Sequence, residues 1–170
     1  REPVAIREDF CGTSAVAREW VCRNDRCTVL GLDLDAKVLD WANRKLQADL
    51  TPEQQSRVSL VEQDVMFARD ELVDCVLAMN FSYYGFKRRD NLLRYFSSVY
   101  KSLVDDGLFL LDAYGGSDSF LEMNEERDLD GFTYVWDQHH VNPINGDVVN
   151  LIHFEFPDGS KIMRAFTYEW

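Results

Sequence analysis

Polar side chains follow short apolar segments in the first half of the chain, and their types suit the binding of a nucleoside. Asp33 follows the apolar segment 28–32, and a carboxylate there can accept hydrogen bonds from both hydroxyls of a ribose. Asp64 comes after the next apolar segment and could accept a hydrogen bond from an adenine amino group. Asn80 follows a third such segment. The spacing therefore predicts a site that these residues share.

The segment from Glu8 to Ser14 has the composition of a ligand-binding loop. Gly12 lets the backbone approach a ligand closely, and the start of the following helix offers free N–H groups. Glu8 adds a carboxylate before the turn, whereas we expect its neighbour Asp9 to be structural. This loop extends the predicted site beyond Asp33.

Other polar and aromatic residues have a plainer interpretation. Asp35 is expected to cap the N-terminus of a helix rather than to contact a ligand, and Asp64 is open to either role. A cluster of aromatic residues after Asn80 either joins the core or lines the site, where it could face a cation (Tyr83, Tyr84 and Phe86). Three histidines are interpreted as ordinary surface or sheet residues (His139, His140 and His153).

The elements that must position these residues alternate between strand and helix in the first two thirds of the chain. The predicted strands are 4–10, 28–32, 58–61, 75–79 and 108–111. The predicted helices start near Thr13, follow Asp35 to about Thr51, and contain Leu92, Phe96, Val99 and Leu103, with Gly107 as the C-cap of the last. This order predicts an α/β fold with a parallel sheet and helices on both faces.

The pattern changes after about Gly131. Three further strands are predicted at 132–136, 148–156 and 161–168, with short turn sequences between them. A parallel strand needs a crossover of about a dozen residues or more, so these strands must form an antiparallel meander.

These segments, in this order, resemble the motifs of class I S-adenosylmethionine-dependent methyltransferases, over about the first 115 residues. Glu8 and Gly12 match the acidic residue and the middle glycine of the family's acidic-x-Gly-x-Gly-x-Gly loop, and Gly31-Leu32-Asp33 matches its second strand end. The resemblance implies a Rossmann-like fold and S-adenosylmethionine (SAM) as cofactor. It implies these cofactor-binding residues: Glu8, Phe10, Gly12, Asp33, Leu34, Asp64, Val65 and Asn80. It assigns no catalytic residue.

One departure from the family pattern concerns the loop. Phe10 and Ser14 stand where the family usually has its first and third glycines. A loop that wraps a pyrophosphate would suffer from this, but SAM has no phosphate. The same departure argues against a nicotinamide or flavin dinucleotide, whose site needs Gly-x-Gly-x-x-Gly.

The function implied is transfer of a methyl group from SAM to a small-molecule acceptor by in-line displacement. The alternatives are a non-catalytic SAM-binding domain and an NAD(P)-dependent oxidoreductase. We interpret residues 1–170 as one domain, with a core at 1–115 and an antiparallel flap at 131–170 that covers the acceptor. The family sheet normally continues beyond such an insert, and the chain begins with Arg1, so we expect it to be a fragment of a longer protein.

The composition limits which partners and which cellular setting we expect. The formal net charge of -12 argues against nucleic acid, whose phosphates require clustered Lys and Arg. The four cysteines form no C-x-x-C pair, so no metal site is expected and a reduced, cytoplasmic setting is the simplest interpretation. No apolar run approaches the length of a membrane span. The sequence gives no indication of the oligomeric state.

Overall fold

The computed structural model describes residues 2–67 and 72–170. The chain divides into two compact units, Arg1–Ala113 and Tyr114–Trp170, and each is considered by itself. Within the described residues, no helix has both the length and the apolar character needed to span a membrane.

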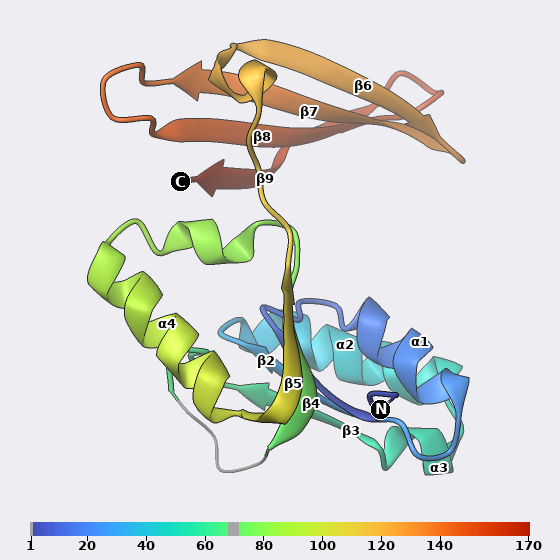
Figure 1. Cartoon of the computed structure of the whole chain (residues 1–170). Helices are drawn as coiled ribbons and strands as arrows, with labels where there is room; N and C mark the ends of the chain where they lie inside the picture. The colour runs from blue at the N-terminus through green and yellow to red at the C-terminus, as the bar shows by residue number, and fades with distance from the viewer. Residues whose placement is uncertain (1, 68–71) are drawn as a thin grey trace. The chain divides into compact units, whose positions relative to one another are not determined.

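The first unit is a five-stranded sheet in the order β3-β2-β1-β4-β5, and every neighbouring pair is parallel (Figure 1). Its strands are β1 (Ala5–Asp9), β2 (Thr28–Asp33), β3 (Val58–Glu62), β4 (Val73–Ala78) and β5 (Leu103–Leu111). Its helices are α1 (Ala15–Arg23), α2 (Ala36–Asp49), α3 (Pro52–Gln55), the 3-10 turn η1 (Ser82–Gly85) and α4 (Arg89–Lys101). The predicted α/β fold with a parallel sheet is confirmed.

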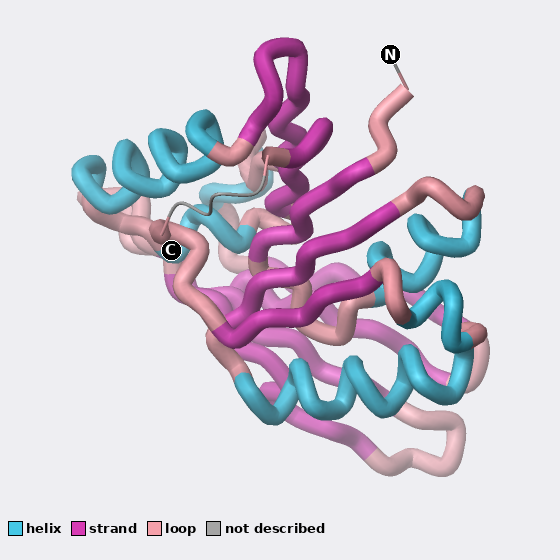
Figure 2. Tube along the Cα trace, turned by 90° about the horizontal axis from the view of Figure 1, so that it is seen from below, coloured by secondary structure: helices cyan, strands magenta, loops and turns pink. Residues whose placement is uncertain are grey.

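Helices cover both faces of this sheet: α1 and α2 lie on one face and α4 on the other (Figures 1 and 2). β4 shows the consequence, because five of its six residues are buried, as expected of a strand covered on both sides. Two apolar clusters result. One joins Ile6 and Val29 to α1 and α2, and the other joins Leu32 and Val76 to α4.

The beginnings of the helices follow from local chemistry. The Asp35 side chain accepts hydrogen bonds from the backbone N–H groups of Lys37 and Val38, so the predicted cap of α2 is confirmed. Thr51 caps α3, and Gln54 completes the reciprocal pair of bonds of a capping box.

The end of α4 differs from the prediction. The helix ends at Lys101 and Ser102 is its cap, whereas Gly107 lies inside β5 and is not a C-cap. β5 therefore starts at Leu103, earlier than expected. The buried face of α4 also differs, because Phe96 is exposed and Tyr95 and Ser98 are buried in its place. The predicted stripe is right at Val99 and wrong at Phe96, because Tyr95 and Ser98 are buried and bond to Asp9 of β1 and to the carbonyl of Val65.

The second unit is a four-stranded antiparallel sheet in the order β6-β7-β8-β9. Its strands are β6 (Met123–Leu129), β7 (Phe132–Val141), β8 (Val148–Glu155) and β9 (Lys161–Glu169), preceded by the 3-10 turn η2 (Ser117–Phe120). The predicted meander is confirmed, with β6 as an additional strand. The sequence of β6, MNEERDL, has no apolar alternation, because nearly all of this strand is exposed. That this sheet covers an acceptor stays a prediction.

Candidate functional site

The parallel register brings the predicted residues to one edge of the first sheet. Glu8 pairs with Gly31, Asp33 pairs with Glu62, and Ala78 pairs with Leu111, so the carboxyl ends of all five strands lie along the same edge. In an open α/β sheet, ligands bind at this edge. The loops after β1, β2, β3 and β4 therefore form the candidate site.

Asp33 ties the loop after β1 to the end of β2. Its Oδ2 accepts a hydrogen bond of 2.8 Å from the backbone N–H of Gly12, and its Oδ1 accepts one of 3.0 Å from that of Asp35. The Cys11 N–H donates to the carbonyl of Leu32 at 3.0 Å. Each carboxylate oxygen has a second lone pair, so Asp33 can hold the loop and still accept a hydrogen bond from a ligand.

The three loop positions where the family has glycine all adopt the left-handed conformation. Phe10, Gly12 and Ser14 have φ values of 57°, 50° and 57°. The loop thus keeps the backbone shape that glycine favours even though two of the three residues carry side chains. The Phe10 ring packs 6.0 Å from that of Phe86 and 5.8 Å from that of Tyr95, between ring centroids, and this core contact fixes the residue in place.

Glu8 presents a buried acceptor near the end of β1, four residues before Gly12. Its side chain is 8% exposed, and its Oε2 has no hydrogen-bond partner among the described residues. The pKa of Glu8 is raised to about 7, mainly by burial and to a smaller extent by the charge of Asp33, against a hydrogen bond with the backbone of Ala17 that lowers it. A Cβ added to Gly12 would meet no protein atom within 4 Å. The site fits a ligand that brings a cationic donor to Glu8 and lies against Gly12.

Cys11 lies in the same loop but is not a nucleophile. Burial raises the pKa of its thiol to about 12, and the nearby charges of Glu8 and Asp33 act in the same direction, against a hydrogen bond with Ser14. A thiol that stays protonated is unreactive. In the part of the chain that the structure describes, no group of three acidic, Cys or His side chains is placed to hold a metal ion.

The turn after β3 shows Asp64 in one of the two roles left open by the sequence, that of a turn cap. Its Oδ1 accepts a hydrogen bond from the Met66 N–H at 2.9 Å, which caps the turn, and contact of this carboxylate with a ligand stays a prediction. Val65 is 4% exposed, so its side chain belongs to the core and only its backbone can face a ligand. Leu34, at the end of β2, is 68% exposed.

The loop after β4 is held by a carboxylate that the sequence reasoning missed. Asp112, directly after β5, accepts hydrogen bonds from the backbone N–H groups of Asn80 at 3.0 Å and Phe81 at 2.9 Å. Both of these residues have φ of 57°. Asp112 could have been found by applying the strand-end rule to the fifth strand. Burial, Tyr84 and the Asp112 charge raise the pKa of Tyr83 to about 12.

Of the three histidines, His153 has a structural role in the second unit. It is buried, its Nδ1 accepts a hydrogen bond from the Arg164 N–H at 2.8 Å, and its Nε2 lies 3.2 Å from a carboxylate oxygen of Asp137. The first contact requires an unprotonated Nδ1, so the proton sits on Nε2 and points to Asp137. These contacts link three strands of the antiparallel sheet.

Comparison with known proteins decides the family. The sequence model described as "Methyltransferase domain" matches residues 9–111, which include the loop after β1 and the ends of β2 to β5. The chain belongs to this methyltransferase family. The match covers the Rossmann-like unit, and it includes every predicted cofactor-binding residue except Glu8. No curated protein matches the chain in sequence.

Solved methyltransferase structures share the fold. An S-adenosylmethionine-dependent methyltransferase from Clostridium acetobutylicum is 20% identical with a TM-score of 0.69, and the match covers 97% of this chain and 64% of that one. The CcbJ methyltransferase from Streptomyces caelestis is 15% identical with a TM-score of 0.73, over 98% and 70%. SAM-bound CalS10, an amino pentose methyltransferase from Micromonospora echinaspora, is 15% identical with a TM-score of 0.69, over 99% and 68%.

These matches indicate the cofactor, and they show how much of a solved methyltransferase this chain spans. Family membership and the SAM-bound neighbour support S-adenosylmethionine as the cofactor. The buried acceptor of Glu8 and the open space at Gly12 agree with it. The chain spans 64% of the length of the Clostridium protein.

Proposed function

We propose that this chain binds S-adenosylmethionine along the carboxyl edge of its parallel sheet and takes part in methyl transfer to a small-molecule acceptor. Two observations carry the proposal: the buried Glu8 carboxyl has an Oε2 without a partner among the described residues, and open space lies over Gly12, four residues further along the chain. A buried polar atom without a partner is costly in a folded protein, and a ligand that supplies a donor removes the cost.

Each end of the cofactor has a matching residue. Glu8 would accept hydrogen bonds from the ammonium group of the methionine part, and ionisation of Glu8 would make this bond charge-assisted. Asp33 would accept from the ribose hydroxyls through its remaining lone pairs. Asp64 would accept from the adenine amino group through Oδ2, while exposed Leu34 and the backbone of Val65 would border the base.

The cofactor supplies a methyl group on a sulfonium, which is already an activated leaving group. The chain's own residues therefore need only to orient the reactants and exclude water. Asn80 and the aromatic residues that follow it stand at the end of β4, where an acceptor would approach the methyl group. We assign no general base, and the transfer needs one only if the acceptor must lose a proton.

The acceptor class is proposed by analogy. CalS10 is described as an amino pentose methyltransferase, and its structure aligns with 99% of this chain. A small, amine-bearing acceptor also agrees with the formal net charge of -12.

The test is calorimetric titration of SAM into the wild type and Asp33→Ala. The variant should bind roughly 100-fold more weakly, because it loses charge-assisted hydrogen bonds to the ribose together with the Gly12 anchor. Asp40→Ala is the matched control, since Asp40 is an exposed carboxylate of the adjoining helix α2 that pairs with Arg44. Equal affinity of Asp33→Ala and wild type would contradict the assignment, and binding of NAD in place of SAM would favour the oxidoreductase alternative.

A further inference from the structure

The face of α4 that meets the sheet is polar at three positions. Tyr95, Ser98 and Ser102 are 0%, 3% and 0% exposed, one turn or less apart along the helix. Buried polar groups are stable only when hydrogen-bonded, so these side chains need partners. Their partners belong to the two segments that flank the proposed cofactor site.

At one end, α4 is bonded to the start of the loop after β1. The Tyr95 hydroxyl donates to Asp9 Oδ2 at 2.9 Å. Arg7 holds the same carboxylate with Nε 2.8 Å from Oδ1 and Nη2 3.0 Å from Oδ2. Asp9 immediately precedes Phe10, the first left-handed residue of the loop. The expectation that Asp9 is structural agrees with these contacts.

At the other end, α4 is bonded to the turn after β3. Arg7 Nη1 donates to Ser102 Oγ at 2.5 Å, and Ser102 Oγ donates to the Ser98 carbonyl at 3.0 Å. Ser98 Oγ then donates to the carbonyl of Val65 at 3.1 Å. One buried network thus runs from Asp9 to Val65, that is, from the loop beside Glu8 to the turn that carries Asp64.

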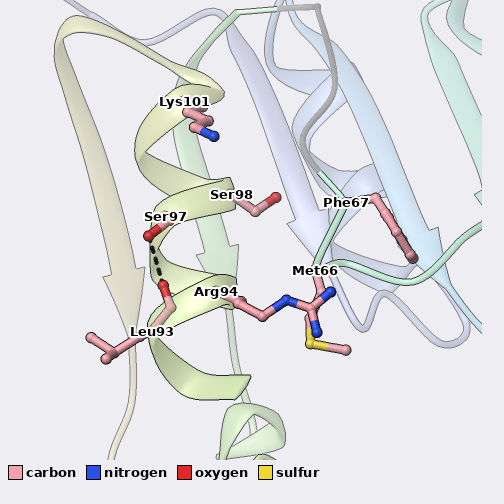
Figure 3. Close-up of a pocket in the computed structure, with 7 residues that line it drawn as sticks. All are labelled: Met66, Phe67, Leu93, Arg94, Ser97, Ser98 and Lys101. Carbon is pink, nitrogen blue, oxygen red and sulfur yellow. Dashed lines mark hydrogen bonds between the residues drawn. The ribbon is translucent and has the colours of Figure 1, made fainter. Parts of the chain in front are cut away.

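Beside Ser98 the packing is loose. A hollow of about 330 Å³ lies between α4 and the segment after Val65, lined by Met66, Phe67, Leu93, Arg94, Ser97, Ser98 and Lys101. Figure 3 shows Ser98 pointing from α4 toward the segment that carries Met66 and Phe67. The neighbouring Ser97 instead donates to the carbonyl of Leu93 in its own helix, at 2.7 Å. Of this pair, only Ser98 bonds to the turn after β3.

We propose that Ser98 is a positioning residue that sets the adenine-side turn at Asp64 and Val65. The proposal rests on SAM as the ligand of the site. Without the Ser98 hydroxyl, the Val65 carbonyl loses its anchor next to a hollow that offers little packing to replace it. The turn can then shift, and the Asp64 carboxylate no longer meets the adenine amino group in the geometry that a hydrogen bond requires.

The test compares two ligands in Ser98→Ala and Ser97→Ala. The ligands are S-adenosylhomocysteine and S-inosylhomocysteine, which lacks the amino group of adenine, and the readout is the ratio of their calorimetric Kd values. Ser98→Ala should reduce the wild-type preference for the adenine ligand by about fivefold, the worth of roughly one hydrogen bond. Ser97→Ala should leave the ratio unchanged. A general loss of stability would weaken both ligands alike and would not move the ratio.

Ser98→Cys keeps the size of the side chain with a weaker donor, so it should give an intermediate ratio and serves if Ser98→Ala does not fold. An unchanged ratio in the folded Ser98 variants would overturn the positioning role while leaving SAM binding intact. Failure of the wild type to bind S-adenosylhomocysteine at all would instead overturn the proposed function.

Discussion

Two loops at the same edge of the sheet contain left-handed residues, and different contacts hold the two loops in place. The loop after β1 has left-handed residues at Phe10, Gly12 and Ser14, and the loop after β4 has two in succession at Asn80 and Phe81. A left-handed conformation costs a residue other than glycine about 1–2 kcal/mol. Both loops are nevertheless built mostly from such residues.

In each loop a carboxylate from the end of a different strand accepts the backbone N–H groups. Asp33 of β2 holds Gly12 with one hydrogen bond, and Asp112 after β5 holds both Asn80 and Phe81. The loops differ in what remains. The first keeps a second, buried carboxyl at Glu8, whereas residues 80–88 of the second loop include no acidic side chain. This difference agrees with the proposal that the first loop receives the cationic end of the cofactor, while the second loop, held by Asp112, presents Asn80.

The largest expected effect tests the crowded carboxyls of the first loop. The pKa of Glu8 is about 7 in the folded protein against an ordinary 4.5, so between these pH values the folded chain keeps a proton that the unfolded chain has lost. The contribution of Glu8 to the stability of the free protein therefore falls as the pH rises from 4.5 to 7. Glu8→Gln should remove this slope and be more stable than wild type at pH 8 by up to roughly 3 kcal/mol.

Urea unfolding at pH 4.5, 6, 7 and 8 measures this slope. Glu62→Gln serves as the control, because Glu62 is an exposed carboxyl at the end of β3. The Glu62 variant should keep the slope of the wild type. If Glu8→Gln keeps the pH dependence of the wild type as well, Glu8 is ionised in the free protein. The buried carboxyl then no longer distinguishes the first loop from the second.

A smaller effect is expected where the carboxylate only holds the backbone. Asp112→Ala frees two N–H groups of left-handed residues, and because this loop is partly exposed to water we expect a loss of about 2 kcal/mol of stability. SAM affinity should fall much less than in Asp33→Ala. Asp106→Ala, at an exposed position of β5, is the control for both measurements. A loss of SAM binding as large as that of Asp33→Ala would make the two carboxylates equivalent and refute the distinction.

Much of the fold could be predicted because apolar runs report burial on both faces. β4 is such a run. Its neighbours are not, because β1 carries three charged residues and the apolar run of β5 is largely exposed, so these two strands followed from the alternation of strands and helices along the chain. β6 could not be found, because an exposed edge strand with the sequence MNEERDL needs no apolar face. The end of α4 was misplaced because Gly107 suggested a cap, whereas pairing of Leu103 with Val73 continues the strand backwards past it.

In the candidate site, too, some residues could be predicted from the local sequence and others could not. Residues at strand ends, such as Asp33, could be predicted from position and type alone. Ser98 could not, because its role depends on a hydrogen bond to a carbonyl 33 residues away. The left-handed conformation of Phe10 could not be predicted either. A phenylalanine in place of the family's glycine suggested a different loop, whereas the structure has a left-handed residue at this position whose ring packs against Phe86 and Tyr95.

The smallest expected effect concerns the strain of the first loop. Ser14→Gly relieves a left-handed residue but frees the unfolded chain, so the net gain should be about 0.5 kcal/mol of stability. Arg164→Gly, at a left-handed position (φ 53°) of β9, should gain a similar amount. The two should differ in SAM affinity: Ser14→Gly loosens the loop that receives the ligand and should weaken binding a few-fold, whereas Arg164→Gly should leave it unchanged. Thermal unfolding with and without SAM measures both quantities, and equal affinities would mean that the serine adds no order to the loop beyond what Asp33 and Phe10 provide.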